Sequence, residues 1–122
     1  MLDFELLRDK GILIVTPHGP LEKADFERVA KEVDLYLAKD GMLSGVMLYA
    51  QGFPGWDSFA AFLAHFKFVK DHQRKIERLA VVTDSDLLKI MPHIVAHFAH
   101  PEVKQFPYGE KATALAWLET TR

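Results

Sequence analysis

The chain has 122 residues, 49% of them hydrophobic and 26% charged, and its formal net charge at pH 7 is -2. This size and apolar content fit one domain over residues 1–122, and the slight negative charge, without a local Lys/Arg run, argues against nucleic-acid binding. Cysteine is absent, which excludes a disulfide framework, thiol catalysis and thiolate metal sites.

The first third of the chain predicts a hairpin followed by a helix. Short extended segments at 4–8 and 12–16 flank Asp9-Lys10-Gly11, where the glycine can take the positive φ of a three-residue loop. Prolines and a glycine at 17–20 end the second strand. Apolar residues then recur at helical spacing from Phe26 to Leu37, which predicts an amphipathic helix with Gly41 as its C-cap.

The rest of the chain alternates between strands and helices. Apolar runs at 46–50 and 79–83 predict buried strands, and 103–106 predicts a short one. Helices are expected at 60–72, at 86–100 with a kink or restart at Pro92, and at 110–119. The order β-β-α-β-α-β-α-β-α predicts an α/β fold: a mostly parallel sheet of about five strands, with an antiparallel N-terminal edge strand and four main helices.

This order and several residue motifs resemble a known family. The motifs are Gly-Phe-Pro-Gly-Trp at 52–56, His-Phe-Lys-Phe-Val at 65–69, Arg-Leu-Ala-Val-Val-Thr-Asp at 78–84, and Val-Lys-Gln-Phe at 103–106 with Ala-Trp-Leu at 116–118. With them, nearly the whole chain resembles the SpoIIAA-like proteins, which are fold relatives of the STAS domains of anti-sigma-factor antagonists and of CRAL-TRIO lipid-binding domains. The resemblance implies a SpoIIAA-like β-α superhelix with a binding or regulatory role and no catalysis.

The loop after the third strand is the best candidate site. Two glycines and a proline separate the 46–50 strand from the aromatic-rich helix at 60–72. In open α/β sheets, ligands bind at the carboxyl ends of strands. We therefore predict that ligand-binding residues gather around this loop and the first half of the helix: Tyr49, Gly52, Phe53, Pro54, Trp56, Phe59, His65 and Phe68.

Helical geometry predicts which side of the 60–72 helix is buried. At about 100° per residue, one apolar arc is expected to face the sheet, made of Phe59, Phe62, Leu63, Phe66 and Val69. The neighbouring flank then carries Ala61, His65, Phe68 and His72. Phe68 on that flank either meets a partner, ligand or membrane, or packs beneath an adjacent helix of the same chain.

The aromatic residues of the loop and helix allow several functions. Phe53 and Trp56 are candidates to line an apolar pocket for a small molecule or lipid, as the CRAL-TRIO resemblance implies. Alternatively, the surface mediates homodimerisation, binds another protein or makes a peripheral membrane contact. The basic residues of the helix lie in its second half, which argues against membrane insertion. The simplest alternative is that both rings plug the end of the core. No cofactor is expected.

Ser58 carries an alternative function. STAS relatives have a regulatory serine at the start of the helix after the third strand, in a pattern close to Asp-Ser-Ser-Gly-Leu-Gly. Asp57 and Ser58 match it, but the second serine and both glycines are missing. A phosphate on Ser58 would meet a helix N-terminus, which favours negative charge. The chain is then a phosphoregulated partner-switching module, unless Asp57 or Ser58 only caps the helix.

Metal and catalytic sites find little support in the sequence. His93, His97 and His100 share one side of the predicted helix at 86–100, opposite its apolar side, which favours a solvated stripe over a metal site. His18 and Asp84 both follow strands whose ends share one rim of the predicted sheet, so a hydrolase that uses both is an alternative. A turn explains His18, capping explains Asp84, and no nucleophile motif accompanies them. We predict no metal and no catalysis.

The sequence also bears on localisation. Residues 1–5 lack the basic region and apolar core of a signal peptide. No apolar run approaches the roughly 20 residues that span a bilayer. We therefore expect a soluble, cytoplasmic protein.

Overall fold

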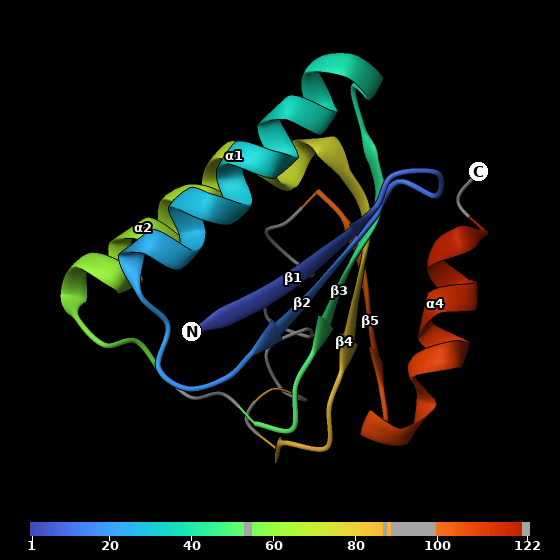
Figure 1. The fold of residues 1–122 in the computed structure, drawn as a ribbon. Coiled ribbons are helices and arrows are strands. Elements are labelled where there is room, and N and C mark those ends of the chain that lie inside the picture. Colours follow the sequence, from blue (N-terminus) through green and yellow to red (C-terminus); the bar gives the residue numbers. More distant parts are fainter. Residues whose placement is uncertain (53–54, 87, 89–99, 121–122) are drawn as a thin grey trace.

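A five-stranded mixed sheet runs through the molecule, with its strands in the order β1-β2-β3-β4-β5 (Figure 1). The computed structural model describes residues 1–52, 55–86, 88 and 100–120. β1 is antiparallel to β2, and the other neighbouring pairs are parallel. The strands are β1 Leu2–Leu7, β2 Ile12–Pro17, β3 Leu43–Tyr49, β4 Ile76–Val82 and β5 Glu102–Phe106.

The hairpin and the first helix form where local signals place them. Gly11 has a φ of 68°, and its N–H donates to the Leu7 carbonyl oxygen at 2.8 Å. Helix α1, Lys23–Asp40, ends at Gly41, which has a φ of 83° and donates its N–H to the Leu37 carbonyl oxygen at 2.8 Å. Glycine takes these positive φ values without the Cβ strain that other residues meet. The positive φ of Gly11 and the C-cap at Gly41 are confirmed. The hairpin loop is one residue longer than predicted, because Leu7 pairs with Ile12 and the loop spans residues 8–11.

Asp25 anchors the start of α1. Its Oδ2 accepts the backbone N–H of Glu22 at 2.8 Å in a capping box, and its Oδ1 pairs with the Arg28 guanidinium at 2.8 Å. Burial works to raise the pKa of Asp25, but these hydrogen bonds favour the carboxylate more strongly and leave the pKa below its ordinary value. The helix therefore begins at a fixed point beside β1.

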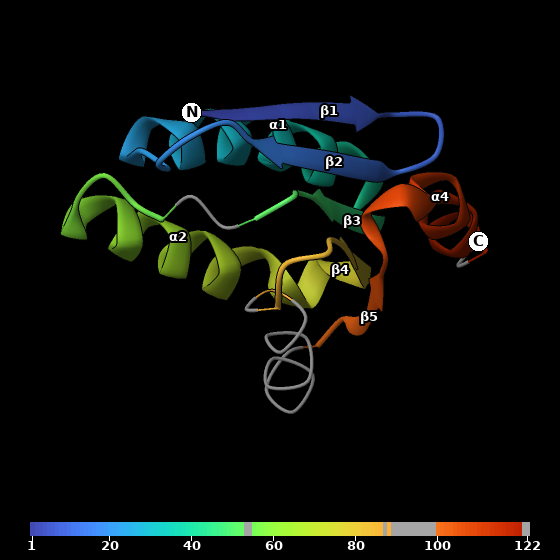
Figure 2. The same cartoon turned by 90° about the horizontal axis from the view of Figure 1, so that it is seen from below.

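Helices cover both faces of the sheet. α1 and α2, Phe59–His72, lie side by side on one face, and α4, Lys111–Glu119, covers the other (Figures 1 and 2). Between α4 and the sheet lies a core cluster that includes Ile14, Met47 and Leu118. Under α1, a second cluster includes Phe26, Val33 and Leu43. Gly45 makes close contact possible, because a Cβ there would lie 2.5 Å from Leu118 Cδ2.

The predicted α/β fold with a mixed five-stranded sheet is confirmed. Strands β3 and β4 each begin three residues earlier than predicted, at Leu43 and Ile76, because polar or small residues at their second and third positions interrupt the apolar run. The described residues contain three α-helices and two short 3-10 segments, η1 Gln73–Lys75 and η2 Tyr108–Glu110. The helix predicted at 86–100 falls mostly outside the described residues. The C-terminal helix begins at Lys111, one residue later than predicted, and η2 precedes it.

Candidate functional site

The loop before α2 is held against the segment that leads into α1. The N–H of Leu21 donates to the Gly55 carbonyl oxygen at 2.8 Å, and the N–H of Asp57 donates to the Leu21 carbonyl oxygen at 2.9 Å. Ser58 is the N-cap of α2, since its Oγ accepts the N–H of Ala61 at 3.1 Å. These contacts set where α2 begins and leave Trp56 beside its first turn.

The inner side of α2 carries small residues and flat rings. Ala61 is fully buried. The His65 ring stacks on Phe26 of α1, with centroids 4.7 Å apart and an interplanar angle of 18°. Phe68 packs against the core cluster under α1 and stacks on His72 at 4.4 Å. The sequence predicts that Phe68 either meets a partner, ligand or membrane or packs beneath a neighbouring helix. The structure supports the second alternative.

His72 fixes the other end of α2 to α1. The imidazole is buried, with Nε2 lying 2.7 Å from Asp34 Oδ1 and Nδ1 lying 2.7 Å from the Phe68 carbonyl oxygen. Each ring nitrogen thus faces an oxygen acceptor. Together with the His65 stack, this pair determines which side of α2 faces α1.

The outer side of α2 is apolar and exposed. With Trp56 it forms the α2 apolar surface, whose members and exposed fractions are Trp56 37%, Phe59 72%, Phe62 38%, Leu63 49%, Phe66 63% and Val69 44%. The prediction that the arc from Phe59 to Val69 faces the sheet is therefore wrong. The opposite flank is the one that packs inward.

The physical reason is that α2 is apolar on two sides. Hydrophobic spacing identifies a buried side only when the other side is polar. Here the inner contacts are specific ones: Ala61 permits close approach, the His65 ring stacks on Phe26, and His72 pairs with Asp34. The two histidines have stacking and hydrogen-bonding partners on α1 and therefore pack inward. The phenylalanines on the opposite side of α2 are then exposed.

Trp56 joins the inner and outer sides of α2. Its indole Nε1–H donates to His65 Nδ1 at 3.1 Å, and its ring meets Phe62 edge-on at 4.8 Å. An accepting Nδ1 carries no proton, so His65 is neutral in this arrangement. Burial lowers the pKa of His65, which favours the same neutral form.

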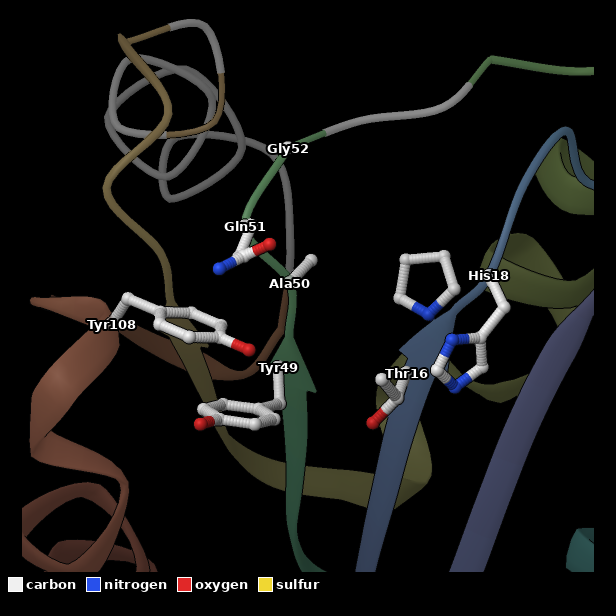
Figure 3. Close-up of a pocket in the computed structure, with 8 residues that line it drawn as sticks. Thr16, His18, Tyr49, Ala50, Gln51, Gly52 and Tyr108 are labelled. Atoms are coloured by element: carbon white, nitrogen blue, oxygen red, sulfur yellow. The ribbon is translucent and has the colours of Figure 1, made fainter.

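Tyr49 and Gly52 lie elsewhere, beside an open cavity of about 260 Å³ at the carboxyl ends of β2 and β3 (Figure 3). Tyr49 stacks on Tyr108, with centroids 4.5 Å apart and an interplanar angle of 7°. The Tyr49 hydroxyl raises the pKa of Tyr108 by hydrogen bonding. The cavity wall is largely polar, and its other members are Thr16, Pro17, His18, Ala50 and Gln51.

The structure thus divides the predicted ligand-binding residues between separate places. Trp56 and Phe59 lie on the α2 apolar surface, and His65 and Phe68 pack inward. Tyr49 and Gly52 line the cavity. Phe53 and Pro54 lie outside the described residues. Sequence reasoning missed four members of the exposed surface, and the signal that could have found them was the second apolar side of the helix: Phe62, Leu63, Phe66 and Val69.

The other sites considered from the sequence are not assembled in the described residues. His18 Nε2 lies 2.8 Å from Asp3 Oδ2, whereas Asp84 Oδ1 accepts the Tyr108 N–H at 3.0 Å, so His18 and Asp84 contact different partners. His93 and His97 lie outside the described ranges. The backbone N–H of the exposed His100 donates to Gln73 Oε1 at 2.6 Å. No group of three potential metal ligands gathers among residues 1–52, 55–86, 88 and 100–120.

Among the helices that the structure describes, none combines the length and the apolar character needed to cross a bilayer.

Comparisons with known proteins identify the family. The SpoIIAA-like family model matches residues 12–119. The chain is similar to an uncharacterised protein from Shewanella loihica, whose crystal structure has a SpoIIAA-like fold, with a TM-score of 0.73 and 23% sequence identity over 97% of this chain and 92% of that one. No curated protein matches. With a family model that spans most of its length and the same fold in a solved structure, the chain belongs to the SpoIIAA-like family.

Proposed function

We propose that this protein is a non-catalytic binding domain that docks an apolar partner through the α2 apolar surface. What supports the proposal is the exposure of six large apolar side chains along one helix and its preceding loop. Together they leave on the order of 600 Å² of apolar surface in contact with water. This lies at the upper end of the largest patch on a typical monomer, and such patches commonly mark interaction sites.

Burial of these rings supplies the driving force for docking. Phe59 and Phe66 are the most exposed of the aromatic members, at 72% and 63%. Moving one such side chain from water into an apolar contact contributes about 2 kcal/mol. The six side chains that define the surface include no acid, base or nucleophile, which suits binding better than catalysis.

The shape of the surface favours a protein face as the partner. A small molecule needs a concave site that surrounds most of it. The α2 apolar surface is one side of a helix, and the cavity beside Tyr49 has a largely polar wall that suits an apolar ligand poorly. Ionic groups of both signs, Lys67 and Asp71, pair beside the surface at 3.4 Å, so it lacks the uniformly basic border of a helix that binds anionic lipid.

The proposal is tested with the double variant Phe59→Ser/Phe66→Ser. The fluorescence of an apolar anilinonaphthalene dye is measured with each protein at a concentration where the chain is monomeric. We expect wild-type protein to enhance the dye emission and the double variant to lose most of that enhancement. Leu35→Ser is the matched control, because Leu35 is 60% exposed on α1 and lies apart from the surface. Equal emission from wild type and the double variant would contradict the proposal.

Vesicles decide between a protein face and a lipid surface. Wild-type protein is mixed with phosphatidylcholine vesicles and sedimented. We expect it to remain in the supernatant. Co-sedimentation that the double variant loses would assign the surface to lipid instead.

Phosphoregulation at Ser58 is a second candidate function. Its side chain is exposed at the N-terminus of α2, next to Phe59 on the docking surface. A phosphate there would add about two negative charges beside apolar rings and weaken docking through the cost of desolvation. The test is mass spectrometry of protein from its native source, combined with dye binding by Ser58→Glu. An unmodified Ser58, with unchanged dye binding by Ser58→Glu, would remove this candidate.

A further inference from the structure

We propose that the partner of the α2 apolar surface is a second copy of this chain, with the two α2 helices packed antiparallel about a two-fold axis. This inference rests on the proposed function and names its partner. A two-fold interface uses the same patch on both copies, so the patch must be complementary to itself. Both the spacing of the exposed residues and the positions of nearby charges meet that requirement.

The spacing of the exposed residues is that of a coiled-coil seam. Phe59, Phe62, Phe66 and Val69 are exposed and follow intervals of three, four and three residues, the a and d positions of a heptad. In an antiparallel pair centred near Ala64, Phe62 of one copy lies opposite Phe66 of the other. Phe59 likewise lies opposite Val69. Each large ring then meets an apolar residue, in four layers along the seam.

Leu63 extends the seam on one flank. It is 49% exposed, and the same antiparallel arrangement brings it close to Leu63 of the second copy across the axis. On this flank Trp56 precedes the helix and Lys70 follows Leu63 by seven residues. Lys70 of one copy therefore approaches Trp56 of the other, where its ammonium group meets an aromatic ring.

Charge complementarity favours the antiparallel direction. Asp57 and Lys70 are both exposed, and neither forms a salt bridge among the described residues. They stand about 20 Å apart along the helix direction. Antiparallel packing brings Asp57 of each copy toward Lys70 of the other and forms two equivalent pairs. Parallel packing would instead place Lys70 beside Lys70.

The available area matches a modest dimer. A standard interface buries about 800 Å² on each partner. The α2 apolar surface offers on the order of 600 Å² of apolar area on each copy. The aliphatic stems of Lys67 and Lys70 add to it, because long charged side chains cover apolar surface while their charged ends stay in water. The helix pair is therefore large enough to hold a reversible dimer.

Sedimentation equilibrium of the tag-free full chain tests the inference. We expect a monomer–dimer equilibrium in the micromolar range. Phe66→Glu should raise the dissociation constant about thirty-fold or more, because it places a charge in the centre of the seam. Leu35→Glu, at the exposed position on α1, should leave it unchanged. A wild-type chain that stays monomeric at millimolar concentration overturns the inference, as does an equal effect of both variants.

A charge swap tests the direction of packing. Asp57→Lys and Lys70→Asp should each weaken dimerisation by about three-fold to ten-fold. The double variant should recover most of the loss, because the opposite charges again face each other. Absence of recovery overturns the antiparallel arrangement.

The two proposals fail in different ways. If wild-type protein is monomeric but Phe59→Ser/Phe66→Ser still loses dye binding, the second copy is excluded and the docking function stands. If dye binding is also unchanged, both proposals fail.

Discussion

At the scale of single residues, His65 is the most informative side chain. It stacks on Phe26, accepts the Trp56 indole N–H at 3.1 Å and has a pKa that burial lowers. One neutral imidazole thereby joins α1, α2 and the loop before α2. Its protonation removes the acceptor that holds Trp56, so acid acts on this contact directly.

We expect acid to destabilise the protein through His65. The unfolded chain binds a proton on His65 near the ordinary pKa of 6.5, whereas the folded chain binds it only at lower pH. The stabilising contribution is therefore complete above that value and is lost as the pH falls toward the folded-state pKa. The free energy of unfolding, measured with urea at neutral and mildly acidic pH, should fall more in wild type than in His65→Phe, which keeps a ring on Phe26 but cannot titrate. Equal losses would contradict this assignment.

Ser58 has a structural role that can be measured separately from any phosphorylation. Its Oγ accepts the Ala61 N–H at 3.1 Å, which satisfies an otherwise unpaired donor of the first helical turn. Ser58→Ala should lower the free energy of unfolding by about 1 kcal/mol, and Ser58→Asp, which can still cap the helix, should lower it less. Urea denaturation of the three proteins measures both effects. A neutral Ser58→Ala would show that the cap contributes nothing.

At the scale of elements, the orientation of α2 controls what the protein presents to a partner. Phe68 and His72 stack against each other on the side facing α1, and His72 reaches Asp34 at 2.7 Å. The same helix turned by half a revolution would bury its large rings and expose its histidines. The specific contacts of the imidazoles with α1 decide between these arrangements.

This orientation predicts opposite costs for two phenylalanines. Phe59→Ala should change the free energy of unfolding by less than about 0.5 kcal/mol, because the ring is 72% exposed. Phe26→Ala should lower it by about 3 to 5 kcal/mol, because that ring is buried under His65. Urea denaturation at a concentration where the chain is monomeric measures both. A large loss of unfolding free energy in Phe59→Ala would instead support the prediction that Phe59 faces the sheet.

At the scale of the whole molecule, the two helical layers depend on different kinds of contact. α1 and α2 share one face of the sheet, where aromatic stacks and the His72–Asp34 pair join helix to helix. Of the helices that the structure describes, only α4 covers the other face, where Gly45 lets Leu118 approach the β3 backbone. Attachment of α4 therefore depends on the absence of a side chain at one strand position.

We expect Gly45→Ala to loosen α4 from the sheet. The added Cβ would lie 2.5 Å from Leu118 Cδ2 and 3.1 Å from Leu118 Cβ, so the helix or its side chain must shift. The free energy of unfolding should fall by about 1 to 3 kcal/mol. Gly52→Ala is the matched control, because nothing lies within 4 Å of a Cβ there. In a Leu118→Ala background, Gly45→Ala should lower the free energy of unfolding by less. An equal loss in both backgrounds would show that contact with the Leu118 side chain is not the cause.

The sequence by itself determined the strands, the first helix and their order. The apolar runs at 46–50 and 79–83 overlap β3 and β4 in all but their last residues, and Gly11 and Gly41 mark the hairpin and the end of α1. These are local signals: apolar spacing, capping groups and glycine at positive φ act within a few residues of each other. These local signals therefore do not depend on how the helices and strands pack against one another.

Only the tertiary structure decided which residues α2 exposes and where Tyr49 lies relative to Trp56. The helix has two apolar sides, and contacts with Phe26 and Asp34, about forty positions away in the chain, select one of them. The pairing of Tyr49 with Tyr108 likewise joins distant segments. Helical periodicity is a property of one segment, whereas burial is a property of two surfaces, so a segment with two apolar sides cannot specify its buried side alone.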